Sequence, residues 1–208
     1  MDRRFDAKNP STQKLYAIIL AELAWASIGL QLYITDLSAL NFFSYFTTLC
    51  NLLIAISLTI SALLPKTLAG NFFSSLSVKS AIAIYIFIVS LVYNLVLRGI
   101  WILTGLAWLL DNMVHVVIPI LYILYWFLFR PRRMLKWQDG IYWLIFPSLY
   151  LVYSLIRGSI IKWYPYPFLN ATKLGYEKVL LNICLMLSVF LIAGLILTST
   201  TRLAKNKD

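Results

Sequence analysis

The chain has 208 residues, of which 61% are hydrophobic and only 12% are charged. A soluble domain of this length could not bury so much apolar surface, so the composition indicates a helical protein that crosses a membrane several times. The net charge of +10 does not indicate nucleic-acid binding, because the basic residues gather in the short segments between apolar windows, where they control topology.

Six windows of the sequence are each long and apolar enough to cross roughly 30 Å of hydrocarbon. We therefore predict an all-α, polytopic membrane protein that forms one domain over residues 1–208. The first span follows a basic N-terminal tail without a cleavage-site pattern, so we interpret it as an uncleaved span and not as a signal peptide. The spans are expected at about residues 15–35, 45–64, 80–97, 111–129, 140–156 and 179–200.

The distribution of lysine and arginine predicts the orientation of these spans. With the N-terminus inside, the cytoplasmic segments carry 13 of the 18 basic residues and the outer segments carry 5. The positive-inside rule then places both termini in the cytoplasm. The expected location is a multi-pass integral membrane protein, in the plasma membrane if the source is bacterial.

In this topology, polar residues of spans two to five lie near the outer face. Thr47 and Asn51 fall in the first two turns of the second span, and the only histidine, His115, falls in the first two turns of the fourth. At a rise of 1.5 Å per residue, Thr47 and His115 each lie within roughly 10 Å of the outer ends of their spans. The other members of this layer are Asn94, Arg98, Asp111, Asn112, Tyr153 and Arg157.

The spacing of these residues gives the layer a chemical meaning. Thr47 and Asn51 are four residues apart, as are Asp111 and His115, so each pair shares one helix face. A carboxylate that orients a histidine, a histidine that removes a proton and a hydroxyl that attacks form a nucleophilic constellation. We therefore predict Thr47 and His115 as catalytic residues. Supporting or substrate-binding roles are predicted for Asn51, Asn94, Arg98, Asp111, Asn112 and Arg157. Alternatively, threonine and asparagine in membrane helices serve as hydrogen-bonding partners of neighbouring helices.

The remaining polar residues do not form a second constellation in the sequence. Glu22 stands alone in the first span, where a carboxylate either relays protons or, when neutral, bonds to a neighbouring helix. Cys50 and Cys184 lie in separate spans without a CxxC or Cys/His neighbour, so we interpret both as packing residues and expect no metal or other cofactor. Residues 163–168 (WYPYPF) fit an interfacial aromatic belt, and residues 170–172 match a glycosylation acceptor.

Several of these segments resemble motifs of the predicted six-transmembrane protein family. The similar segments are residues 45–53 (YFTTLCNLL), 111–119 (DNMVHVVIP), 150–158 and 163–170 (WYPYPFLN). That family is similar to the androgen-induced and androgen-dependent membrane proteins of animals, which hydrolyse fatty acid esters of hydroxy fatty acids. The resemblance implies an intramembrane threonine nucleophile at Thr47, next to Thr48, and a histidine at His115. The family often carries an acidic residue before a tryptophan late in the fourth span, where this chain has Tyr125.

The leading prediction is therefore an intramembrane threonine hydrolase of a lipid or fatty-acid ester. Its partners would be the ester substrate and membrane lipids, with no nucleic acid. Two alternatives belong to other classes. In the first, Glu22 and the outer polar layer line the pocket of a membrane binder or transporter of a small or lipidic ligand. In the second, the chain is a structural membrane protein whose polar layer only joins its helices.

Overall fold

The computed structural model describes residues 10–130 and 133–205. These residues form helices and connecting turns, with no β-strand among them, which confirms the all-α prediction. They cluster into two compact units, each of which is described by itself. Within the described chain, unit 1 holds residues 10–36 and 47–130, and unit 2 holds residues 37–46 and 133–205. The single domain stays a prediction.

Within the described residues, six helical segments are long and apolar enough to cross a membrane, as predicted. They are Pro10–Ile34, Phe46–Leu63, Leu76–Leu97, Gly105–Phe129, Trp137–Ile161 and Tyr176–Arg202. The fourth begins six residues earlier than expected, because Gly105 turns the chain into the helix with a φ of +56°. His115 therefore lies ten residues into its helix, which is about 15 Å along the axis and deeper than the 10 Å predicted.

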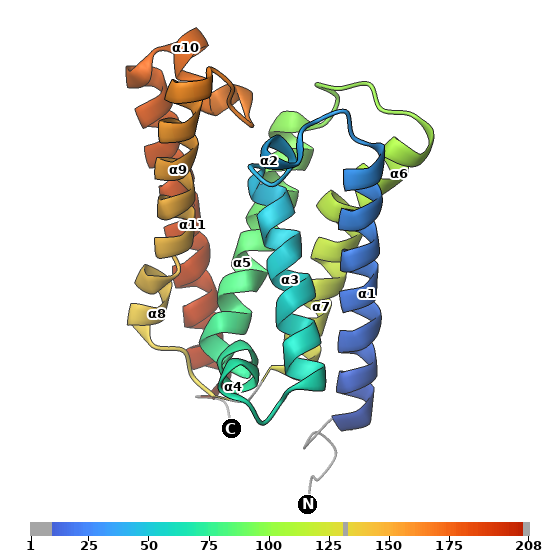
Figure 1. Ribbon diagram of the computed structural model, residues 1–208. Helices are drawn as coiled ribbons and strands as arrows, with labels where there is room; N and C mark the ends of the chain where they lie inside the picture. Colours follow the sequence, from blue (N-terminus) through green and yellow to red (C-terminus); the bar gives the residue numbers. More distant parts are fainter. Residues whose placement is uncertain (1–9, 131–132, 206–208) are drawn as a thin grey trace, which may run out of the picture. The chain divides into compact units, whose positions relative to one another are not determined.

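Unit 1 contains four long helical segments. Its elements are α1 (Pro10–Ile34), α3 (Phe46–Leu63, from its second residue), α4 (Leu68–Ser74), α5 (Leu76–Val92), α6 (Gly105–Asn112) and α7 (Ile118–Phe129). α5 packs along α7, and α1 packs against α6 and α7 (Figure 1). Two π-helical turns interrupt this regular geometry. Tyr93–Leu97 continues α5, and Met113–Val117 joins α6 to α7.

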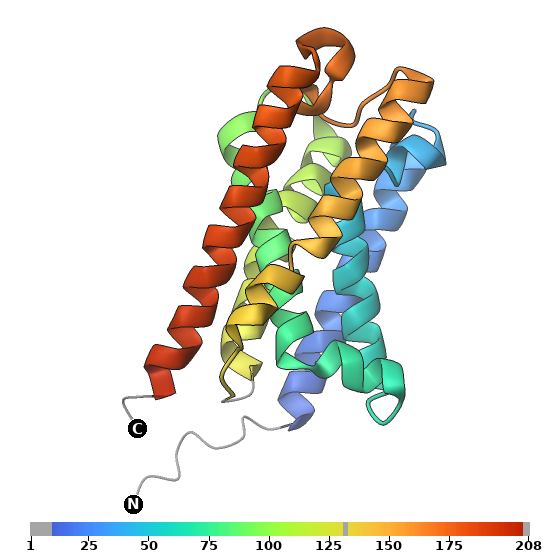
Figure 2. The ribbon, with the colours of Figure 1, turned by 90° about the vertical axis from the view of Figure 1, so that its left-hand side faces the viewer.

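Unit 2 is built on two long neighbouring helices, α9 and α11. Its elements are α2 (Ala39–Phe42), α8 (Trp137–Tyr142), α9 (Ile145–Ile161), a 3₁₀ turn (Pro167–Leu169), α10 (Ala171–Leu174) and α11 (Tyr176–Lys205). α9 and α11 run in opposite directions, and the segment with α10 joins them at one end (Figure 2). The predicted fifth span is thus split into α8 and α9. The break lies before Pro147, which has no N–H for the Trp143 carbonyl.

Gly158 of α9 makes a close approach that a larger residue would obstruct. A Cβ atom at this position would lie 2.1 Å from Cε1 of Tyr164, whose side chain is buried. We expect Gly158→Ala to destabilise the protein by about 1–2 kcal/mol and to lower its melting temperature in detergent by about 2–6 °C. Gly29→Ala in α1 is the matched control, because its Cβ would meet nothing within 4 Å. Equal melting temperatures for the two variants would contradict this prediction.

Candidate functional site

His115 lies in the π turn between α6 and α7, and Pro119 explains why the helix widens there. Proline has no N–H, and its ring clashes with the carbonyl four residues earlier, which is that of His115. The helix forms a wider bond instead, from the Ile118 N–H to the Met113 carbonyl. The next carbonyl, that of Val114, would need an N–H from Pro119, so the helix offers it no donor. Such π turns are frequent at functional sites.

The imidazole of His115 is held by Asp111 from one turn earlier. Its Nδ1 lies 3.0 Å from the Asp111 carboxylate Oδ1 and 2.9 Å from the Asp111 backbone carbonyl oxygen. Because both neighbours of Nδ1 are acceptors, Nδ1 carries the proton of the neutral ring and Nε2 is left as the basic nitrogen. Both side chains are mostly buried, with exposed fractions of 13% and 14%. The four-residue spacing therefore places a carboxylate on a histidine, as predicted.

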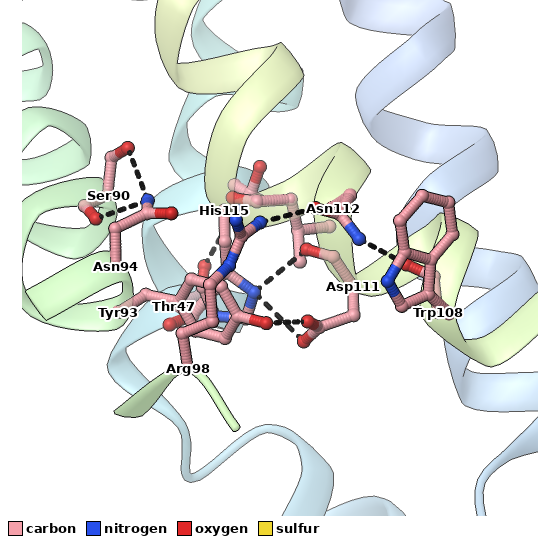
Figure 3. Close-up of polar contacts among 11 residues, drawn as sticks. Thr47, Ser90, Tyr93, Asn94, Arg98, Trp108, Asp111, Asn112 and His115 are labelled. Atoms are coloured by element: carbon pink, nitrogen blue, oxygen red, sulfur yellow. Dashed lines mark hydrogen bonds and ion pairs between the residues drawn. The ribbon is translucent and has the colours of Figure 1, made fainter. Parts of the chain in front are cut away.

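Tyr93 completes this arrangement from the first π turn. Its ring stacks on the imidazole of His115, with centroids 3.8 Å apart and planes 12° from parallel. Its hydroxyl donates a hydrogen bond to Oδ2 of Asp111. One carboxylate oxygen thus accepts from Tyr93 and the other contacts Nδ1 of His115 (Figure 3). The sequence analysis missed Tyr93. Its only signal there was its position next to Asn94, and tyrosine near a span end is readily explained as an interfacial residue.

Arg98 and Asn112 border this cluster. The Arg98 guanidinium lies 5.6 Å from the Tyr93 ring centroid, and its Nη2 donates to Oδ1 of Asn112 over 2.6 Å. Asn112 in turn donates from Nδ2 to the Trp108 carbonyl over 2.8 Å (Figure 3). Arg98 is exposed in unit 1, and Asn112 is partly buried. They bring a cation and an amide next to the Asp111–His115 pair, as their places in the sequence predicted.

Asn51 connects the turn that carries Thr47 to the π turn that carries His115. Its side chain is fully buried, and its Nδ2 donates to the Thr47 carbonyl over 2.9 Å and to the Val114 carbonyl over 3.1 Å. The second bond satisfies the carbonyl that Pro119 leaves without a helical donor. Both Nδ2 hydrogens are thereby used, so Asn51 joins the two turns and has no donor left for a substrate. Thr47 and the adjacent Thr48 are both buried, and Figure 3 draws Thr47 with His115.

Two of the predicted supporting residues make contacts elsewhere. Asn94 is exposed and bonds to the backbone and side chain of Ser90, one turn earlier on its own helix (Figure 3). Arg157 belongs to unit 2, where its Nη2 donates to Oδ1 of Asn41 over 2.6 Å and its guanidinium lies over Trp163. Neither contact joins the Asp111–His115 pair.

The sequence analysis also considered Glu22, Cys50 and Cys184. Glu22 is exposed on α1. Cys50 is buried in unit 1 and Cys184 is exposed in unit 2, and both are free thiols. Among the residues that the structure describes, no three histidine, cysteine or acidic side chains gather as metal ligands would.

The cluster in unit 1 thus combines an oriented histidine base, a carboxylate that holds it, an aromatic ring stacked on it and a nearby guanidinium. Asn51 of α3 bonds to the backbone carbonyl of Thr47, whose side chain is buried, and to the Val114 carbonyl of the same π turn. These groups suit acyl transfer, in which a base activates a hydroxyl and a cation offsets developing negative charge. The chain matches no protein-family model, no curated protein and no solved structure.

Proposed function

We propose that the chain is an intramembrane hydrolase that cleaves a lipid or fatty-acid ester through Thr47 and His115. In this proposal, the six apolar helices cross the membrane with both termini in the cytoplasm, as the lysine and arginine distribution favours. The Asp111–His115 pair then lies in the outer half of the membrane. An acyl chain can enter from the surrounding lipid, and water can enter from outside.

The reaction begins when Nε2 of His115 accepts the proton of the Thr47 hydroxyl. The Thr47 oxygen attacks the ester carbonyl, and the tetrahedral intermediate collapses as His115 returns that proton to the departing alcohol. His115 then deprotonates a water molecule, which attacks the acyl-threonine ester. Collapse of the second intermediate releases the fatty acid, and the proton returns to Thr47.

The observation that carries this proposal is the bond between Nδ1 of His115 and the Asp111 carboxylate. This bond holds the ring in the tautomer that makes Nε2 a base. The negative charge of the Asp111 carboxylate stabilises the imidazolium that forms during attack. Arg98 is the best candidate to stabilise the oxyanion, because one bond to Asn112 leaves its other donors available. One such donor is typically worth about 3 kcal/mol of barrier. The resemblance to the predicted six-transmembrane protein family supports the same two catalytic positions.

The test is covalent labelling of the purified protein with a fluorophosphonate, followed by peptide mapping. We expect an adduct on Thr47 that is lost in Thr47→Ala and at least ten-fold weaker in His115→Ala, because the hydroxyl needs its base. Thr48→Ala is the matched control, since it removes the adjacent buried hydroxyl and should leave labelling intact.

An adduct on Thr48, or labelling that persists without His115, would contradict the assigned roles. Complete absence of labelling from folded protein that also shows no esterase activity would favour the membrane binder or transporter instead.

A further inference from the structure

A second group of polar residues lies where α5 begins and α7 ends, at the end of unit 1 that carries α4 (Figure 1). Lys79, the fourth residue of α5, is only 6% exposed, and its ammonium lies 5.6 Å from the ring centroid of Tyr125 in α7. The neighbouring pair, Ser80 and Trp126, is also buried and joined by an indole hydrogen bond of 2.8 Å. Lys79 is therefore fixed among aromatic side chains.

The positive charge of Lys79 has no counterpart among the described residues of unit 1. No hydrogen bond or ion pair joins its ammonium to any of them, and the Tyr125 ring lies beside it. The carboxylates of this part of the chain are Glu22, Asp36 and Asp111, of which Asp111 is bound to His115. Because the Lys79 side chain is largely buried, its positive charge is costly without an anionic partner, and a tyrosine ring compensates only part of that cost.

Arg130 is a second cation at this end of α7. The Arg130 guanidinium lies 4.8 Å from the ring centroid of Trp126, the residue after Tyr125. The Arg130 side chain is partly buried, and this burial lowers its pKa. Lys79 also lies in the first turn of α5, where the helix dipole places further positive charge. Lys79 lies over Tyr125, Arg130 lies over Trp126, and Trp126 bonds to Ser80 near the N-terminus of α5, so all three positive groups lie around these two rings and favour an anion.

We propose that Lys79 and Arg130 bind the phosphate of an anionic phospholipid at this end of unit 1. A phosphate would accept hydrogen bonds from both cations and supply the missing negative charge. Basic pockets between membrane helices on the cytoplasmic side bind anionic headgroups in this way, and the lysine and arginine distribution assigns this end to that side. Acyl chains would lie on exposed apolar side chains of the same end, Leu15, Leu68 and Phe72.

The proposal can be tested by thermal unfolding in detergent supplemented with phosphatidylglycerol or with phosphatidylcholine. We expect phosphatidylglycerol, and not phosphatidylcholine, to raise the melting temperature of the wild-type protein by about 4 °C or more. Lys79→Met should abolish this shift, and Arg130→Gln should at least halve it. Lys66→Met is the matched control: it removes an exposed lysine near the same end and should retain the full shift.

An equal shift in Lys79→Met and in the wild-type protein would overturn the proposal, as would the loss of the shift in Lys66→Met. If Lys79→Met does not fold, the halved shift of Arg130→Gln carries the test alone. Glycerol phosphate at millimolar concentration identifies the source of the anion. A shift equal to that of the lipid would overturn the lipid assignment in favour of a soluble phosphate, and no shift would support it.

Asp2 and Asp6 lie outside the described residues and require their own variant, Asp2→Asn combined with Asp6→Asn. A lipid shift that is unchanged in this variant supports a headgroup as the partner of Lys79. A shift that appears only in this variant, and not in the wild-type protein, would overturn the proposal. None of these measurements depends on hydrolase activity.

Discussion

Asp111→Asn is expected to lower kcat for ester hydrolysis by about 10³-fold or more while KM changes little. The carboxylate now accepts a hydrogen bond from Nδ1–H of His115 on one oxygen and a hydrogen bond from the Tyr93 hydroxyl on the other. A carboxamide that turns its NH₂ to Nδ1 selects the wrong tautomer and blocks Nε2 as a base. A carboxamide in the opposite orientation keeps the tautomer but removes the charge that stabilises the imidazolium.

This effect can be measured with a fluorogenic fatty-acid ester in detergent or in reconstituted vesicles. Asp36→Asn is the matched control, because it changes an exposed aspartate of the same unit and should retain full activity. Activity of Asp111→Asn within ten-fold of the wild-type value would contradict the role of Asp111. Such a result would leave His115 oriented only by its own helix backbone and by Tyr93.

Much of the fold follows from composition because a membrane leaves few choices. Every backbone polar group must be bonded within its segment, so six long apolar windows predict six helices. The ends of the helices were harder to predict. Residues 100–110 are apolar throughout, and only the backbone turn at Gly105 decides where the fourth helical segment begins. Pro147 divides the fifth segment into two helices, a break that hydropathy averages do not detect.

The candidate site was predictable where it depends on local spacing. Asp111 and His115 are four residues apart on one helix, so their contact needed no knowledge of the tertiary structure. Tyr93 was not predictable in this way, because its contact with His115 depends on the packing of α5 and its π turn against the helix that carries His115. Hydropathy and periodicity carry no signal for a π turn. Pro119 was visible in the sequence, but its consequence for the Val114 carbonyl required the structure.

The same reasoning explains the different outcomes for two asparagines. Asn51 and Asn94 both stood in the sequence as polar residues of the outer layer. In the structure, Asn51 joins two elements through carbonyls, one of which the helix cannot satisfy, whereas Asn94 bonds only within its own helix. The sequence contains the reason for the difference, since Pro119 creates a carbonyl that needs a side-chain donor. Only the packing of α3 shows which asparagine provides it.

Asn51→Leu is therefore expected to have the second largest effect, on stability and activity together. It leaves the buried Val114 carbonyl without a donor, a loss of about 2 kcal/mol that should lower the melting temperature by about 4–8 °C. It also removes the link between the turns of Thr47 and His115, and small displacements of reacting groups lower rates by about 10²-fold. Asn94→Leu, the same substitution at an exposed site, should not lower the melting temperature.

A double-mutant cycle with Pro119→Ala isolates the cause of this effect. Alanine restores the N–H that residue 119 lacks, so the helix can again supply donors to the carbonyls of its preceding turn. If Asn51 is required because Pro119 is present, Asn51→Leu should cost less than half as much stability in the Pro119→Ala background as in the wild-type protein. Equal losses in both backgrounds would show that Asn51 stabilises the protein by packing alone. A coupled loss would establish that the proline, the π turn and the buried amide act as one structural unit beneath His115.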